Sequence, residues 1–117
     1  HAPHASIEKD IEFQNAAFGI TGLETALSLS LRLVFNNVLT LPELIKKLTI
    51  NPARILKLVK GTLAPGSDAD ITLIDPEAGV TVDRDSFKSK SRNTPFHGWK
   101  LKGKAVYTIV SGKVVFH

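Results

Sequence analysis

Apolar residues in the middle of the chain recur with the period of a helix. Between Gly22 and about Phe35 they lie three or four positions apart, as on one face of an amphipathic helix. These apolar positions are Leu23, Ala26, Leu27, Leu31, Val34 and Phe35. The pattern therefore predicts a helix over this stretch. The first twenty residues show neither a helical nor a strand period, which predicts a long loop before it.

Two shorter helices are predicted from their start signals. Thr40 and Glu43 have the spacing of a capping box, and Pro42 is tolerated in a first turn, so a helix is expected to Leu48. Asn51 is expected to cap a third helix, because a proline suited to the first helical position follows it. The apolar face and the stop signal of this helix are Ala53, Ile55, Leu56, Val59 and Gly61.

After Gly61 the apolar residues alternate with a period of two, which is typical of strands. Ala69–Asp75 is predicted to be a strand that Pro76 ends. The other strand-like runs are Val80–Val82, Lys104–Val110 and Lys113–Phe116, the last two joined as a hairpin across Ser111-Gly112. Helices and strands are thus segregated, which predicts a mixed α/β chain without βαβ units and with few strands for a sheet of its own.

Composition narrows the class of protein. Apolar residues make up 43% and charged residues 22% of the 117 positions, which is ordinary for a globular chain. No run of about 18 apolar residues exists, so no membrane-spanning helix is predicted. The absence of cysteine excludes disulfides and thiolate metal sites, and it is compatible with a reducing cytoplasm, where we expect the protein to be located.

The net charge of +4 is unevenly distributed. The segment from residue 88 onward carries seven basic residues and no acidic one: Lys88, Lys90, Arg92, Lys100, Lys102, Lys104 and Lys113. Such a segment binds an anionic partner, nucleic acid included, or forms a solvated face. The second interpretation is favoured, because the basic residues alternate with strand-forming residues and no nucleic-acid-binding motif accompanies them.

Histidines are the first candidates for chemistry. His1 and His4 lie three positions apart, but two ligands are fewer than a zinc site needs. His97 and His117 are far away in the sequence, so no self-contained metal site is expected. The Gly19-Ile-Thr-Gly22 stretch lacks the spacing of a Walker loop.

Several motifs resemble the bacterial dihydroorotases. The stretches His1-Ala-Pro-His4, Glu8-Lys9 and Phe18–Leu27 resemble the segment after the eighth barrel strand of that family. The ending, from Asn93-Thr-Pro-Phe-His-Gly-Trp99 to Val115, is also similar to dihydroorotases. Asn51–Leu56 and Gly61–Asp75 resemble the amidohydrolase superfamily more broadly. The resemblance covers nearly the whole chain but only the C-terminal part of the family's length.

The resemblance implies a fold, a reaction and a cofactor. The family fold is a (β/α)₈ TIM-type barrel with a small β-sandwich. Residues 1–60 would end the barrel, with the loop after strand eight and its helices, and residues 61–117 would form the C-terminal part of the sandwich. The implied reaction is the zinc-dependent, reversible cyclisation of N-carbamoyl-L-aspartate to dihydroorotate in pyrimidine biosynthesis. The implied partners are the N-terminal part of the same enzyme, further copies of it in a homo-oligomer, and aspartate transcarbamoylase.

The resemblance also assigns residues. The catalytic aspartate would stand immediately before His1, and the zinc ligands would lie further upstream. The chain is therefore interpreted as a C-terminal fragment that contains no catalytic residue or metal ligand and is inactive alone. His4 matches a substrate-binding histidine, Phe18 and Gly19 match the loop whose backbone meets the substrate, and His1 has at most a supporting role.

Three alternatives stay open. A hydantoinase-like cyclic amidohydrolase is one, although Gly22-Leu-Glu24 favours dihydroorotase. A catalytically inactive dihydroorotase homologue that serves as a scaffold for aspartate transcarbamoylase is the second. A basic nucleic-acid-binding module is the third, and it rests only on the charge asymmetry.

Overall fold

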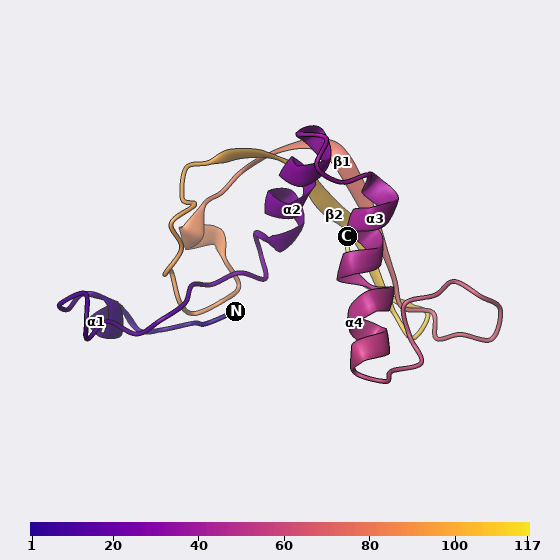
Figure 1. Cartoon of the computed structure of the whole chain (residues 1–117), viewed down its shortest axis with the longest axis horizontal. Helices are drawn as coiled ribbons and strands as arrows, with labels where there is room; N and C mark the ends of the chain where they lie inside the picture. The colour runs from indigo at the N-terminus through magenta and orange to yellow at the C-terminus, as the bar shows by residue number, and fades with distance from the viewer.

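The computed structural model describes residues 1–117, in which all the helices precede the sheet. The elements are α1 (Ser6–Lys9), α2 (Ala26–Phe35), α3 (Leu41–Leu48), α4 (Ile50–Ile55), β1 (Ile71–Thr81), the 3₁₀ turn η1 (Arg84–Ser86), β2 (Lys100–Val110) and β3 (Lys113–Phe116). The chain forms an arch of 52 × 29 × 28 Å, with the first twenty residues at one foot and α4 at the other (Figure 1). The predicted segregation of helices and strands is confirmed.

Helix α2 begins at Ala26, later than the apolar pattern predicts. The backbone amides of Gly22 and Leu23 donate to the imidazole of His1, and residues 23–25 form a turn. Leu31, near the middle of α2, is completely buried. One-turn helix α1 was not predicted, because four residues are too few to show a helical period.

The capping box of α3 is confirmed. The Thr40 hydroxyl accepts a hydrogen bond from the Glu43 amide, and the Glu43 carboxylate accepts one from the Thr40 amide at 2.8 Å. Hydrogen bonds from the Thr40 hydroxyl and amide also lower the pKa of Glu43. The helix ends at Leu48, as predicted.

Replacing Thr40 with alanine is expected to lower the free energy of unfolding by about 1 kcal/mol, the usual contribution of an N-cap side chain. Urea titration of the protein that carries this chain measures the change. Thr40→Ser keeps the hydroxyl and should retain most of the stability. Equal losses in the two variants would show that the cap is not the cause.

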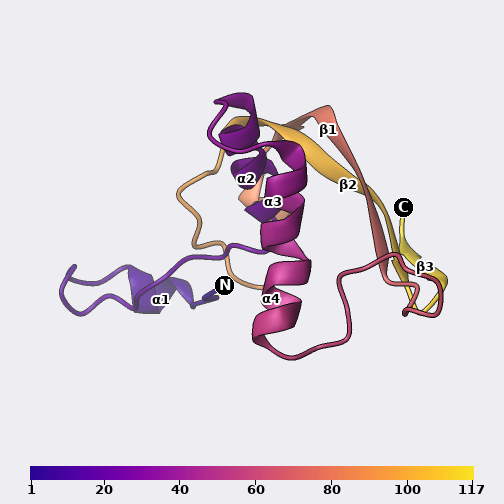
Figure 2. The ribbon, with the colours of Figure 1, turned by 45° about the vertical axis from the view of Figure 1, so that its right-hand side comes forward.

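The predicted start of the third helix is wrong. Helix α4 begins at Ile50, Thr49 occupies its N-cap position, and Asn51 lies within its first turn. The hydroxyl of Thr49 donates to the carbonyl of Ile45, so this residue joins the end of α3 to the start of α4. Figure 2 shows the two helices nearly in line, beside the strands of the sheet. Of the predicted apolar face only Ala53 is buried.

The predicted break at Pro76 is also wrong. Strand β1 continues through Pro76 to Thr81 and includes most of the short strand predicted at Val80–Val82. A β-bulge lies between Asp75 and Gly79, where the register against β2 shifts. The proline has no N–H to donate, so its place in a bulge costs no ladder hydrogen bond. The Asp75 carboxylate accepts hydrogen bonds from the amides of Glu77 and Ala78, and these bonds stabilise the bulge.

The predicted hairpin is confirmed. The sheet is antiparallel with the order β1-β2-β3, and Val110 pairs with Lys113 across the turn. Ser111 and Gly112 both have positive φ, at 50° and 76°, as a two-residue I′ turn requires. The Ser111 amide donates to the Asp70 carboxylate. The hydrogen-bonded ion pair with Lys60 is the main cause that lowers the pKa of Asp70, and the hydrogen bond from the Ser111 amide lowers it further.

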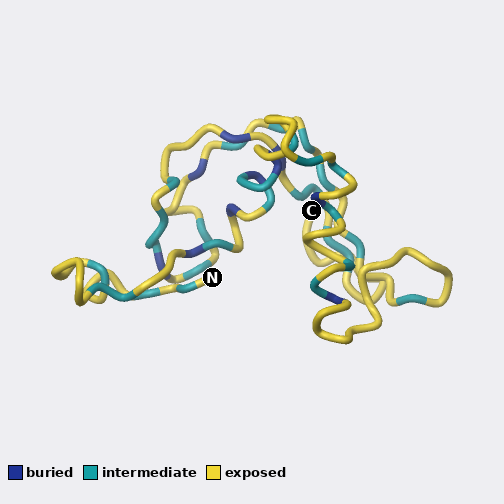
Figure 3. Tube along the Cα trace, in the orientation of Figure 1, coloured by how far each residue is buried: buried dark blue, intermediate teal, exposed yellow.

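Few apolar residues are buried, and they are spread over α2, α3, α4 and the sheet. These residues are Leu31, Leu44, Ala53, Val82 and Leu101. The Ser28 hydroxyl donates to the carbonyl of Gly103 at 2.6 Å, which brings α2 directly onto β2. Most of the trace in Figure 3 is exposed or half-buried. Large apolar side chains such as Phe13 and Val59 are more than nine-tenths exposed, a pattern typical of surfaces that contact further protein. None of the helices has the length and apolarity to cross a membrane.

Candidate functional site

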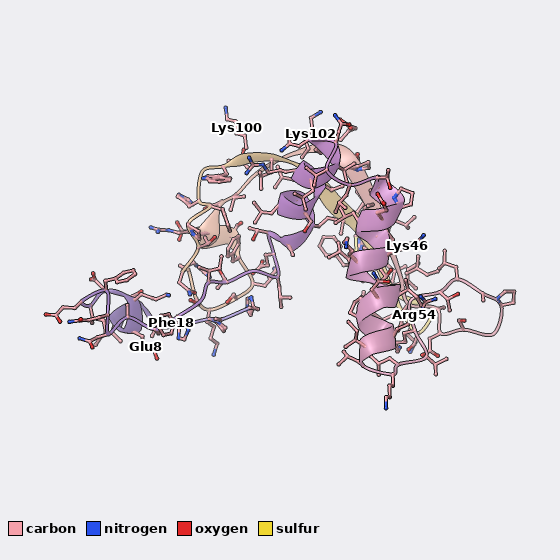
Figure 4. All side chains as sticks on the ribbon, in the orientation of Figure 1. Glu8, Phe18, Lys46, Arg54, Lys100 and Lys102 are labelled. Carbon is pink, nitrogen blue, oxygen red and sulfur yellow. The ribbon has the colours of Figure 1, made fainter.

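The first twenty residues form a closed loop at one foot of the arch. The amide of Ala2 donates to the carbonyl of Ile20 at 2.8 Å, so the two ends of the loop meet. Inside it, the Ala17 amide donates to the carbonyl of Glu8 at 3.0 Å. Figure 4 shows Glu8 and Phe18 together in this loop. This segment, residues 1–20, is called the substrate loop below, after the role that the resemblance to dihydroorotases implies for it.

The structure brings His4 and Phe18 into direct contact. The Nε2 atom of His4 lies 2.8 Å from the carbonyl oxygen of Phe18. A carbonyl oxygen only accepts, so Nε2 carries the proton in this hydrogen bond. The Nδ1 atom lies 3.8 Å from the Glu8 carboxylate. The aromatic ring of Phe18 is 89% exposed, and it makes no core contact here.

Gly19 is required by both its conformation and its surroundings. Its φ is +91°, a region that side-chain-bearing residues rarely adopt. A Cβ atom at this position would lie 2.6 Å from the Cβ of Ala2. Only glycine therefore lets the end of the loop pass this close to its beginning.

The carbonyl groups around Phe18 are all bound, whereas two neighbouring amides are free. Lys9 Nζ donates to the carbonyl of Ala17 at 2.5 Å and to that of Gly19 at 2.7 Å. The carbonyl of Phe18 accepts a hydrogen bond from His4. The N–H groups of Phe18 and Gly19 donate to no group in the chain. The loop thus presents backbone donors while its acceptors are occupied.

Three residues of this site were missed by the sequence analysis. Lys9 was noticed only within the Glu8-Lys9 pair, and Asn93 only as the first residue of a motif. Ser91 gave no signal. The Ser91 hydroxyl lies 2.6 Å from the carbonyl oxygen and 3.1 Å from the amide nitrogen of His4. The Asn93 side-chain amide donates to the carbonyls of Ala2 and Gly19, at 2.9 and 3.3 Å.

A cavity of about 530 Å³ lies beside the loop. Phe18 and Gly19 line it together with three cationic residues, Lys9, Arg84 and Arg92, and no acidic residue. A concave surface with this lining attracts anions.

Two further histidines, His1 and His97, accept hydrogen bonds from backbone amides. His1 Nδ1 accepts from the amides of Gly22 and Leu23 at 3.0 and 3.3 Å. His97 Nδ1 accepts from the amide of Arg84, a residue that lines the cavity beside the loop. The structure contains no group of three or more His, Cys, Asp or Glu side chains placed to bind a metal ion.

The basic residues after position 88 lie mostly on the surface. Lys102 Nζ pairs with the Glu77 carboxylate at 2.6 Å, across from β2 to β1. Figure 4 shows Lys100 and Lys102 at the top of the arch, far from the substrate loop. This part of the charge asymmetry therefore has no role in the loop site.

Comparison with known proteins decides the family. The sequence profile described as "Amidohydrolase family" matches residues 11–115, nearly the whole chain. The chain belongs to the amidohydrolase family. Membership in an enzyme family favours the enzyme interpretations over a nucleic-acid-binding module.

Curated relatives narrow the resemblance within the amidohydrolases. The dihydroorotases of Geobacter metallireducens and Syntrophus aciditrophicus are 61% and 54% identical over 116 residues. Each alignment covers 99% of this chain and 27% of the relative. The chain thus spans about a quarter of the length of these relatives.

Solved amidohydrolase structures have the same fold as this chain. The L-hydantoinase (dihydropyrimidinase) of Arthrobacter aurescens matches with a TM-score of 0.83 and 35% identity, over 91% of this chain and 24% of that one. The D-hydantoinase (dihydropyrimidinase) of Thermus sp. matches with a TM-score of 0.85 and 25% identity, over 100% and 27%. Identity is higher to the dihydroorotases than to these hydantoinases.

Proposed function

We propose that this chain is the C-terminal segment of a dihydroorotase and supplies part of its substrate-binding site. The observation that carries the proposal is the contact between His4 and Phe18, with Gly19 beside them. The 61% identity to a dihydroorotase supports the choice of substrate, dihydroorotate or N-carbamoyl-L-aspartate. The hydantoinase alternative has lower identity, 35% at TM-score 0.83.

The proposed role of the loop is to bind the carboxylate of the substrate. When protonated, the His4 imidazole has a second donor at Nδ1, for which a substrate carboxylate would compete with the Glu8 carboxylate 3.8 Å away. The free N–H groups of Phe18 and Gly19 add two backbone donors. The cavity beside Phe18 and Gly19, which His4 does not line, has Lys9, Arg84 and Arg92 in its lining, and this favours an anion near the two amides. Arg84 is the cation whose side chain makes no ion pair or hydrogen bond, since Lys9 donates to two carbonyls and Arg92 faces Asp85 at 3.9 Å.

Zinc, which the resemblance implies, does not fit the residues of this chain. No group of three ligand side chains exists, and the Nε2 of His4 and the Nδ1 of His1 are occupied by hydrogen bonds. In the proposed enzyme the metal ligands and the catalytic aspartate come from residues outside this chain. The contribution of this chain is to bind and orient the substrate.

The proposed place of the chain in the enzyme follows the same resemblance. Residues 1–60 would complete a (β/α)₈ barrel and residues 61–117 a small β-sandwich. The exposed apolar residues of α4 and of the following loop support this, because such surfaces are normally covered. These residues are Ile55, Leu56, Leu58, Val59 and Leu63. A homo-oligomer in the cytoplasm, with aspartate transcarbamoylase as a partner, completes the proposal.

The test is a substrate comparison on the full-length protein that carries this chain. We expect the protein to open the ring of dihydroorotate and to catalyse the reverse reaction with N-carbamoyl-L-aspartate, both measured by the change in absorbance. We expect no measurable turnover of hydantoin. Preference for hydantoin would replace the proposal with the hydantoinase alternative. No turnover of either substrate, with a stable complex with aspartate transcarbamoylase, would instead support the inactive scaffold.

A further inference from the structure

A segment far along the chain holds the substrate loop in place. Residues 88–93 run beside the first 24 residues. The Glu24 carboxylate accepts from the amides of Lys88 and Ser89 at 2.8 and 3.0 Å, which fixes the start of this segment. The Thr21 amide donates to the carbonyl of Asn93 at 3.1 Å, which fixes its end. Ser91 lies between these two attachments, and Asn93 is itself the second of them.

Ser91 binds the backbone of His4 on both sides of its Cα atom. Its hydroxyl accepts from the His4 amide and lies within hydrogen-bond distance of the His4 carbonyl. The hydroxyl also contacts the side-chain oxygen of Asn93. It carries one proton, so it donates to one of these two oxygens at a time. Ser91 is buried, with 7% of its surface exposed, so water does not compete freely for these bonds.

Asn93 binds the two ends of the substrate loop together. One side-chain NH₂ group donates to the carbonyl of Ala2, two positions before His4, and to the carbonyl of Gly19, directly after Phe18. The Gly19 carbonyl belongs to the peptide group between Gly19 and Ile20, directly after the peptide group that carries the free Gly19 amide. Asn93 therefore holds the backbone next to the free amides, while His4 and Lys9 bind the carbonyls of the two peptide groups that carry them.

We propose that Ser91 and Asn93 are positioning residues for substrate binding. Their side chains bind the loop itself, although Asn93 also lines the cavity beside it. They act through His4 and the Phe18-Gly19 backbone, whose spacing they set from a segment about 90 positions away. This inference rests on the proposed function for its effect on KM, but its effect on the loop itself can be measured separately.

The test uses Asn93→Ala and Ser91→Ala in the full-length protein, with two readouts. Hydrogen–deuterium exchange measures protection of backbone amides in residues 1–22. We expect faster exchange there in both variants, and a KM for dihydroorotate raised by about tenfold with little change in kcat, since substrate binding loses its preorganisation. Ser91→Thr, which keeps the hydroxyl, should retain most of the wild-type amide protection and a KM close to that of the wild type.

Ser86→Ala is the matched control. The Ser86 hydroxyl is exposed and donates to the carbonyl of Asp83 at 2.8 Å, without contact to the substrate loop. This variant should change neither exchange nor KM. The proposal is overturned if loop exchange in Asn93→Ala equals that of the wild type, or if exchange rises while KM stays unchanged. A wild-type protein without dihydroorotase activity would defeat the proposed function alone, because the exchange result still decides whether Ser91 and Asn93 hold the loop.

Discussion

Replacing Gly103 with alanine is expected to lower the free energy of unfolding by about 3 kcal/mol or more. A Cβ atom at this position would lie 2.1 Å from Cδ1 of Leu31, which is completely buried, so relief of the clash must displace other packed atoms. The φ of Gly103 is +94°, a conformation that is strained for alanine. Overpacking of a core and backbone strain each cost about 1–3 kcal/mol, and both act here.

Gly79→Ala is the control for Gly103→Ala, since both residues flank the bulge between β1 and β2. Gly79 has no heavy atom within 4 Å of a Cβ at its position, and its φ is not positive. Its replacement should change stability by less than about 0.5 kcal/mol. Urea titration compares the two variants in the same protein. A Gly103→Ala variant as stable as the wild type would contradict the close contact between α2 and β2.

Replacing His4 with alanine in the full-length protein is expected to raise KM for dihydroorotate by about tenfold to a hundredfold. Hydrogen bonds to charged groups contribute about 1.5–3 kcal/mol, and about 1.4 kcal/mol corresponds to a factor of ten. The proposed contact with the substrate carboxylate exists equally in the ground state and the transition state. Its loss should therefore change KM more than kcat.

Metal content separates this role of His4 from that of a ligand. We expect the zinc content of His4→Ala, measured by elemental analysis, to equal that of the wild type. His117→Ala is the control, because His117 lies exposed after β3, near Tyr107 and away from the loop. Loss of zinc in His4→Ala would show that His4 is a ligand and that the proposed carboxylate contact is wrong.

Local signals were predictable from the sequence because their causes are local. The capping box of Thr40 and Glu43 depends on four neighbouring residues, and the Ser111-Gly112 turn depends on two. The path of β1 through Pro76 was not predictable, because the bulge exists only against its partner strand β2. In the same way Thr49, rather than Asn51, begins α4 through a contact with the preceding helix.

The candidate site was predictable only in part, and for a similar reason. His4, Phe18 and Gly19 came from the motif resemblance, not from residue spacing, and the structure then brought them together. Ser91 and Asn93 bind main-chain atoms, so neither needs a complementary side chain that a sequence pattern would reveal. Long-range contacts between side chain and backbone leave little trace in composition or period.

The bond between Ser91 and His4 joins residues that are 87 positions apart. During synthesis the ribosome releases the N-terminal part of a chain first, so the substrate loop emerges well before the segment that holds it. Closing so long a separation also has a larger entropic cost than forming the local contacts of the loop. The substrate loop would thus be among the last parts of this chain to reach its final structure. A chain that terminates before residue 91 would lack the hydrogen bonds from Ser91 and Asn93 that hold this loop.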